Sequence, residues 1–463
     1  MRRVLLPLLL LVLALPAPAA AATRYVVNGA GYGHGIGMSQ WGAYGYAKQG
    51  SSYRDILAHY YAGTTLGQAD QRPVRVLLQD GRPTISFSGA STGGGRDLDP
   101  SRTYTVRKSG AAGVELRASG GGSMGATDGP LVVSSASGSV RLGGTALNGV
   151  GGGAYRGALE FRPSASGGVL AVNTVGLDDY VQGVVPGESP SSWPADALRA
   201  QAVAARTYAL ATNRGGGVFD QYPDTRSQVY RGLSSEAAST NQATRDTAGQ
   251  VLRYGNAIAV TYFFSASGGR TENVENVFYG SAPKPYLRAV ESPYESASPK
   301  NHWRLSFTAA QMQSRLGSLV KGRFRSVNVL QRGASPRVVK AEVRGSGGAT
   351  PVNGATLKAR LGLFDTWAYF SKVSASSARP ARAAQRSWTA RLVPGGHTAG
   401  VVRGAIAPRP LGTARLERRA GRRWRAVRRV ETSVGGRFRA PVTERGSYRL
   451  RAGTTITPVV HIR

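Results

Sequence analysis

Residues 178–212, DDYVQGVVPGESPSSWPADALRAQAVAARTYALAT, are the most informative stretch of this 463-residue chain. The apolar run Val181–Val185 predicts a short strand, and the Pro-Gly pair that follows it predicts a break. Pro194 suits the first turn of a helix, where its missing N–H costs nothing. From Ala195 to Thr212 the chain is rich in alanine and lacks glycine and proline, which predicts a helix of about four to five turns.

A single glutamate, Glu188, stands in the predicted loop between the strand and the helix. Because Trp193 and an alanine-rich helix follow it closely, we expect its carboxyl group to be partly desolvated, which raises a pKa. A raised pKa is what a general acid needs near neutral pH. The local sequence alone favours a solvated loop glutamate that has no catalytic role.

The start of the chain predicts export. Met1-Arg2-Arg3, an apolar run over 4–15 and a tail of small residues are typical of a secretory signal peptide, here over residues 1–22. No later stretch is long and apolar enough to predict a transmembrane anchor. The chain has no cysteine, which excludes a disulfide framework and a thiolate zinc site. We therefore expect a protein that is secreted or held at the cell wall.

The chain is strongly basic, with 59 Lys and Arg against 25 Asp and Glu and a net charge of +34. Residues 380–463 alone hold 19 arginines against three glutamates, a net charge of +16. A genome that favours arginine codons and electrostatic retention on an anionic wall polymer are both compatible with this excess. Nucleic acid is a poor partner for an exported chain.

The remaining pattern predicts an α+β fold. Short β-type runs alternate with Gly/Ser clusters over 72–168, which predicts a β-rich subdomain. A second helix is expected over 235–249 and a strand over 257–262. The Ser/Ala/Arg-rich residues 374–386 predict a linker, and 387–463 show strand patterns without a helix signal, which indicates a small immunoglobulin-like β-sandwich.

Two motifs resemble known signatures. Gly183-Val-Val-x-x-Glu188, continued by Trp193-Pro-x-Asp and the alanine-rich helix, resembles the signature of the SpoIID/LytB family, named after stage II sporulation protein D and the amidase enhancer LytB. GHGIGMSQWGA at 33–43 resembles a second signature of that family, which closes the domain in the sporulation proteins but here opens the mature chain. The order suggests a circular permutation, which predicts that residues 25–27 lie beside 367–373 and that His34 lies near Glu188.

The resemblance implies a domain architecture and an activity. It implies a SpoIID-like domain over 23–373, made of the permuted segment 23–67, the β-rich subdomain 72–168, a catalytic core over 169–303 and its closure over 304–373. It also implies a lytic transglycosylase that cleaves MurNAc–GlcNAc bonds of glycan strands without stem peptides, with Glu188 as general acid and then base.

The resemblance also guides the choice of site residues. The residues expected to bind substrate are Trp193, Arg206, Tyr208, Gln228, Tyr230, Ser265, Ser267 and Gly268. The residues expected to position Glu188 without binding the substrate are His34, Ser39 and Gln40. Some relatives use a zinc ion held partly by cysteine. Because this chain has no cysteine, we expect no metal and no cofactor.

The expected partners are peptidoglycan glycan strands, with a cell-wall amidase and an anionic wall polymer as further candidates. Three alternatives stay open. The chain is compatible with a non-catalytic glycan-binding enhancer of an amidase, or with a hydrolase that uses Asp178, Asp179 or Asp224 as a second carboxylate. A purely structural wall protein is the third.

Overall fold

The computed structural model describes residues 23–373 and, in the C-terminal region, 393–395, 399–405, 414–421, 423–430, 437–442, 444–452, 455–456 and 459–462. The chain divides into two compact units, with the boundary between Ser376 and Ser377. The predicted signal peptide and the predicted linker lie outside the described residues. No helix of the described part is long and apolar enough to cross a membrane.

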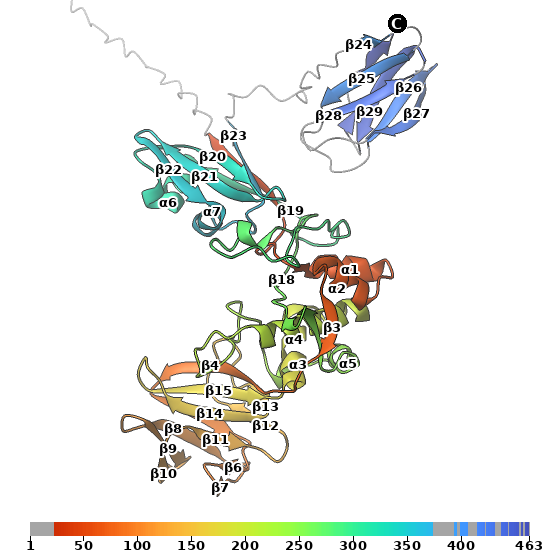
Figure 1. Ribbon diagram of the computed structural model, residues 1–463. Coiled ribbons are helices and arrows are strands. Elements are labelled where there is room, and N and C mark those ends of the chain that lie inside the picture. The colour runs from red at the N-terminus through yellow and green to blue at the C-terminus, as the bar shows by residue number, and fades with distance from the viewer. Residues whose placement is uncertain are drawn as a thin grey trace, which may run out of the picture. The chain divides into compact units, whose positions relative to one another are not determined.

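The first unit contains a β-sandwich of two six-stranded antiparallel sheets with the orders β10-β9-β8-β5-β12-β13 and β4-β15-β14-β11-β6-β7 (Figure 1). The strands are β4 Val74–Arg82, β5 Thr84–Ser88, β6 Thr92–Gly93, β7 Arg96–Asp97, β8 Thr103–Ser109, β9 Gly113–Ala118, β10 Ser123–Asp128, β11 Leu131–Ser134, β12 Ser139–Leu142, β13 Ala154–Arg156, β14 Ala158–Pro163 and β15 Val169–Val175. Strands β4–β14 lie within residues 72–168, where a β-rich subdomain was predicted, and β15 leads directly into the helical region.

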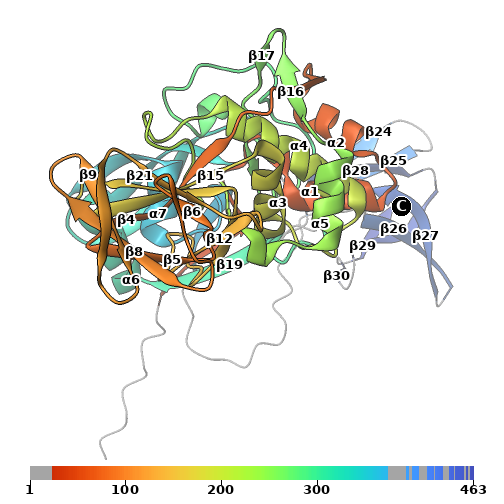
Figure 2. The same cartoon turned by 90° about the horizontal axis from the view of Figure 1, so that it is seen from below.

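A group of helices follows, in which α1, α2, α3 and α5 all pack against α4 (Figures 1 and 2). The helices are α1 Gln40–Lys48, α2 Tyr53–Tyr60, α3 Leu177–Glu188, α4 Ala195–Ala211 and α5 Ala238–Asp246, and the short strands among them are β2 Met38–Ser39, β3 Thr65–Gln68, β16 Gln250–Tyr254, β17 Ala257–Ile258 and β18 Phe263–Phe264. The predicted helix after Pro194 is confirmed as α4. Its small alanine side chains let four neighbouring helices approach it closely.

Helix α3 corrects the predicted strand over Val181–Val185. Its buried residues include Leu177, Tyr180, Val181, Val184 and Val185, which recur at the three- and four-residue spacing of one helix face. The helix continues through Pro186. Glu188 is therefore the last residue of a helix and not part of an irregular loop. The helix predicted over 235–249 is shorter, as α5, and only Ala257–Ile258 and Phe263–Phe264 are strands around 257–264.

The N-terminal strand β1, Arg24–Ala30, lies in the middle of a three-stranded antiparallel sheet between β19, His302–Thr308, and β23, Ala368–Val373. Arg24 pairs with Val373 and Gly29 with Ala368, so the predicted neighbourhood of residues 25–27 and 367–373 is confirmed. The other elements of this region are β20 Phe324–Arg332, β21 Val338–Gly345, β22 Gly348–Asn353, α6 Ala309–Leu316 and α7 Gly354–Leu361.

All described elements of the second unit are strands, as predicted. They form an antiparallel sheet in the order β24-β25-β28 and a second one in the order β27-β26-β29-β30, in which β31 also pairs with β29. The strands are β24 Val393–Gly395, β25 Ala399–Ala405, β26 Ala414–Ala420, β27 Arg423–Val430, β28 Arg437–Val442, β29 Gly446–Ala452, β30 Thr455–Ile456 and β31 Val460–Ile462.

A buried arginine holds the helices of the first unit together. Arg206 of α4 is fully buried, and its guanidinium donates to Asp178 Oδ1 at 2.7 Å at the start of α3. The same guanidinium donates to the carbonyl oxygens of Gln250 at 3.2 Å and Thr244 at 3.3 Å. Arg206 thus joins α3, α4, α5 and β16 through one side chain.

We predict that Arg206→Met lowers the free energy of unfolding by about 3–5 kcal/mol, because it leaves two carbonyl groups without their donor and Asp178 without its counter-ion. Urea unfolding followed by circular dichroism measures this. Arg199→Met on the same helix is the matched control: Arg199 pairs with Asp246 at 2.7 Å but its side chain is 30% exposed, so its loss costs less than about 1 kcal/mol. Equal losses for the two variants would contradict the assigned role of Arg206.

Candidate functional site

The carboxyl group of Glu188 is held by two segments that are distant in sequence. Its Oε1 accepts a hydrogen bond from the backbone N–H of Val229 at 2.7 Å. Its Oε2 accepts one from the side-chain amide of Gln40 at 3.1 Å. Gln40 precedes Glu188 by 148 residues, so this contact joins the two motifs that the sequence analysis singled out.

The surroundings of Glu188 favour its protonated form. Burial is the largest influence and raises the pKa of the carboxyl group, while the hydrogen bonds from Val229 and Gln40 and the positive charge of Arg231 pull in the opposite direction. The net pKa lies above the usual value. Glu188 also ends α3, where the partial negative charge of a helix C-terminus disfavours a carboxylate. The residue as a whole is only half-buried.

Ser39 and Gln201 fix the position of the Gln40 amide. Ser39 is the N-cap of α1, and its side chain accepts from the N–H of Gly42 at 3.2 Å, which sets the first turn of the helix. Gln40 starts that helix, and its amide also donates to Gln201 Oε1 of α4 at 3.4 Å. The amide is therefore held between α4 and the carboxyl group of Glu188.

Three aromatic rings form a partly exposed cluster from the segments that follow Gln40 and Glu188. The ring of Trp193 lies 4.9 Å from that of Trp41 and 5.2 Å from that of Tyr44, and all three side chains are half-buried. Exposed aromatic faces suit the apolar faces of sugar rings. Trp193 was predicted to bind substrate and Trp41 and Tyr44 were not, although Trp41 directly follows Gln40 in the quoted motif.

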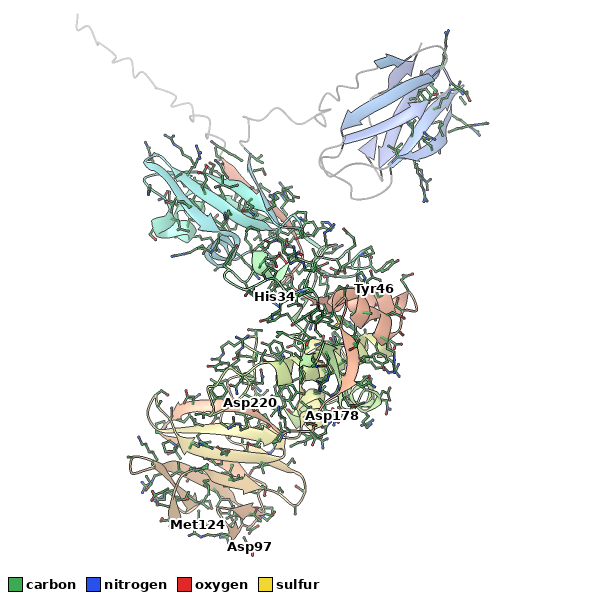
Figure 3. All side chains as sticks on the ribbon, in the orientation of Figure 1. His34, Tyr46, Asp97, Met124, Asp178 and Asp220 are labelled. Atoms are coloured by element: carbon green, nitrogen blue, oxygen red, sulfur yellow. The ribbon has the colours of Figure 1, made fainter. Side chains whose placement is uncertain are left out.

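His34 has a different role from the one expected. Its ring packs against Phe264, Phe278 and Tyr262, and its Nδ1 accepts from the N–H of Ile36 at 3.0 Å. Burial, with smaller influences from nearby positive side chains, lowers the pKa of His34 to about 3, so the ring is neutral at physiological pH. None of its described contacts is with Glu188. Gln40, from the same motif at 33–43, contacts Glu188 instead. In Figure 3 His34 lies apart from the labelled Asp178 at the start of α3.

Several residues expected to bind substrate have partners inside the protein. Arg206 is fully buried, and its guanidinium binds Asp178 and backbone carbonyl groups of α5 and β16. The hydroxyl group of Tyr230 donates to Asn173 Oδ1 at 2.6 Å, and the amide of Gln228 donates to Tyr180 Oη at 3.2 Å; both residues are 1% exposed. These three side chains support the elements that carry Glu188 and Val229 and do not line a surface.

The Ser-Gly turn is likewise part of the interior. Ser267 is fully buried, and its hydroxyl group and N–H donate to the carboxylate of Glu295 at 2.6 and 2.7 Å. The N–H of Gly268 donates to the same carboxylate at 3.0 Å. These groups therefore bind Glu295 where we expected them to bind sugar hydroxyls. Ser265 is half-buried, and its carbonyl oxygen accepts from the N–H of Trp41 at 2.9 Å.

Tyr208 is 5% exposed, and its hydroxyl group accepts from Arg214 at 3.1 Å. It lies on α4, with its ring against Tyr262 and Phe263. Of the eight residues expected to bind substrate, Trp193 is thus the one with both partial exposure and a cluster of partly exposed aromatic neighbours. Among the described residues no group of three or more His, Asp or Glu side chains is arranged to hold a metal ion.

The structure also limits the choice of a second carboxylate. Asp178 and Asp179 lie in the first turn of the helix that Glu188 ends, so at 1.5 Å per residue they are about 14–15 Å away along its axis. Inverting glycosidases separate their two carboxyl groups by about 6.5–9.5 Å and retaining ones by less, so neither aspartate fits. Asp224 is bound by Arg226, which lowers the pKa of Asp224.

The comparisons with known proteins concern this region. Residues 165–254 match the family of stage II sporulation protein SpoIID. The chain is 32% identical to stage II sporulation protein D of Bacillus subtilis over 208 residues, which is 41% of this chain and 57% of that protein. It is 37% identical to the amidase enhancer of the same species over 142 residues, which is 30% of this chain and 19% of that protein.

An uncharacterised protein of Brachyspira hyodysenteriae is 39% identical over 150 residues, 32% of this chain and 39% of that protein. The chain thus spans less than two thirds of each of these relatives. The matched residues 165–254 include α3 with Glu188, α4, Val229 and β16. The resemblance to the SpoIID/LytB family that the motifs predicted is thus confirmed over residues 165–254.

Proposed function

We propose that this protein is a lytic transglycosylase of peptidoglycan glycan strands, with Glu188 as its only catalytic carboxyl group. The observation that carries the proposal is the carboxyl group itself, which is desolvated and held by two hydrogen bonds in a residue that is only half-buried. The relatives named for sporulation and for amidase enhancement support a role at the cell wall.

The two hydrogen bonds determine where the acidic proton resides. The N–H of Val229 can only donate, so Oε1 stays an acceptor in both protonation states. We infer that the neutral acid carries its proton on Oε2, because Oε1 accepts the shorter bond, 2.7 Å against 3.1 Å, as the carbonyl oxygen of a carboxylic acid does; Oε2 retains one lone pair for the amide of Gln40. Oε2 is the atom that would protonate the glycosidic oxygen.

The reaction then needs no second carboxylate. As Glu188 gives its proton to the leaving oxygen, the C6 hydroxyl group of the muramoyl sugar attacks the anomeric carbon. The carboxylate of Glu188 accepts the proton of that hydroxyl group, which yields a 1,6-anhydromuramoyl end and regenerates the acid. Because the nucleophile belongs to the substrate, correct positioning replaces a second catalytic group. The rings of Trp41, Tyr44 and Trp193 would provide this positioning by stacking on sugar units.

A second candidate function is supported by the amidase enhancer. In that case the same surface binds glycan strands, and the protein stimulates an amidase without cleaving the strands. The two functions differ in whether Glu188 must titrate.

We predict that the wild-type protein releases 1,6-anhydromuramoyl fragments from glycan strands freed of their peptides, and that Glu188→Gln releases none. The amide side chain can still accept from the N–H of Val229, so folding and strand binding persist. It provides no acidic proton, so cleavage is lost. Mass spectrometry of the products measures this, with thermal unfolding and strand pull-down as controls. Intact strands with both proteins would favour the enhancer, and fragments with a free reducing end would favour a hydrolase that uses Asp224.

We further predict that Gln40→Met moves the alkaline limb of the profile of kcat/KM against pH to higher pH, by about one pH unit. The Gln40 amide stabilises the ionised carboxylate, so its loss raises the pKa of Glu188, and a hydrogen bond to a charged group is worth about 1.5 kcal/mol or more. Gln201→Met is the control, because Gln201 contacts Gln40 and not Glu188; its shift should be smaller. An alkaline limb that moves to lower pH in Gln40→Met would refute the assignment of the limb to a Glu188 carboxyl group whose charge Gln40 stabilises.

A further inference from the structure

One face of the sheet formed by β27, β26 and β29 carries a row of three arginines. Residues directly opposite each other on antiparallel strands share a face. Arg415 of β26 lies opposite Arg429 of β27 on one side and opposite Arg451 of β29 on the other. All three residues are exposed. The row crosses three strands, so it spans about 10 Å at the usual inter-strand spacing.

The burial of neighbouring residues shows that this is the outer face of the sheet. Leu416 is fully buried and Val430 is 3% exposed. Tyr448 of β29, which pairs with Arg418, is 1% exposed. These residues alternate with the arginines along their strands and therefore point to the opposite face, into the interior of the unit.

The outer face holds little acid to balance its positive charge. Among the described residues of these three strands its one acidic side chain is Glu417, which pairs with Arg449 at 2.7 Å and with Arg451 at 3.1 Å. The arginines of the outer face are Arg415, Arg419, Arg429, Arg449 and Arg451. Like charges directly opposite each other destabilise a sheet, so an anion bound across the row would relieve a repulsion built into the fold.

The chemistry of the row indicates the type of anion. Planar guanidinium groups bind phosphate oxygens in pairs, and a phosphodiester keeps its charge at all relevant pH values. Its two free oxygens can accept from arginines on neighbouring strands. The one aromatic ring of the outer face among these strands, Trp424, is covered by the guanidinium of Arg449 at 4.3 Å. Nucleic-acid bases would therefore find no open ring on which to stack.

We propose that this outer face is a binding site for a linear phosphodiester polymer without bases, of the kind that would retain an exported protein at a cell wall. The site is independent of Glu188 and does not rest on the proposed transglycosylase activity. It also gives a specific location to part of the basic charge that the sequence concentrates after residue 380.

The test uses the full chain and a fluorescent poly(glycerol phosphate) probe. Changing Arg415, Arg429 and Arg451 together to Gln is expected to weaken binding at least about tenfold and to flatten the dependence of log affinity on log salt concentration. Changing the exposed Arg423, Arg425 and Arg445 to Gln removes the same net charge away from the row and is expected to weaken binding less than about threefold. Thermal unfolding verifies that both variants fold.

Three results would overturn the proposal. Equal weakening by the two triple variants would mean that net charge and not this face determines binding. No binding by the wild type at physiological salt would exclude the site. Tighter binding of a single-stranded oligonucleotide of equal charge would assign the face to nucleic acid.

Discussion

Strand β1 is held on both edges by strands from the far end of the same unit, and the position of the candidate site depends on this pairing. Seven residues of β1 pair with β19 and six with β23, so the start of the described chain is fixed in the middle of a sheet. The chain then runs through a glycine-rich segment into α1. Gln40, at the first position of α1, reaches Glu188 because its segment is anchored in this way.

The candidate site shows how a fold can raise the pKa of a carboxyl group and still offer hydrogen-bond donors to its ionised form. Burial and a helix C-terminus disfavour the charge on Glu188, while a backbone N–H and the Gln40 amide offset part of this effect. Those donors stabilise the ionised form of the carboxyl group, and burial stabilises the protonated form. The two donors bind different oxygen atoms, Val229 at Oε1 and Gln40 at Oε2.

Residue patterns within single segments predicted the main elements of the fold. Pro194 and the alanine-rich run predicted α4, and alternation with frequent turns predicted a β-rich subdomain where the β-sandwich lies. Helix α3 was missed because Pro186 and Gly187 were given more weight than the spacing of Leu177, Tyr180, Val181, Val184 and Val185, which is helical. In the structure the helix includes that Pro-Gly pair near its end.

The site was less predictable, because its contacts are made between distant segments. Gln40 and Ser39 were selected through the resemblance, but the bond from the N–H of Val229 involves a backbone group that carries no sequence signal. Arg206, Gln228, Tyr230 and Ser267 were selected as polar residues in matching motifs. Their burial gives them protein partners, which a pattern of residue types cannot reveal. Trp41 and Tyr44 could have been found, since aromatic residues beside Gln40 are visible in the sequence.

The most direct measurement is the titration of Glu188 itself, by NMR of the protein labelled with carbon-13 at glutamate side-chain carboxyl groups. The signal that is absent from Glu188→Gln identifies the residue. The proposed mechanism predicts a pKa above the usual glutamate value of 4.5. A pKa at or below that value would mean that the carboxyl group is ionised near neutral pH, and it would contradict the assignment of Glu188 as the general acid.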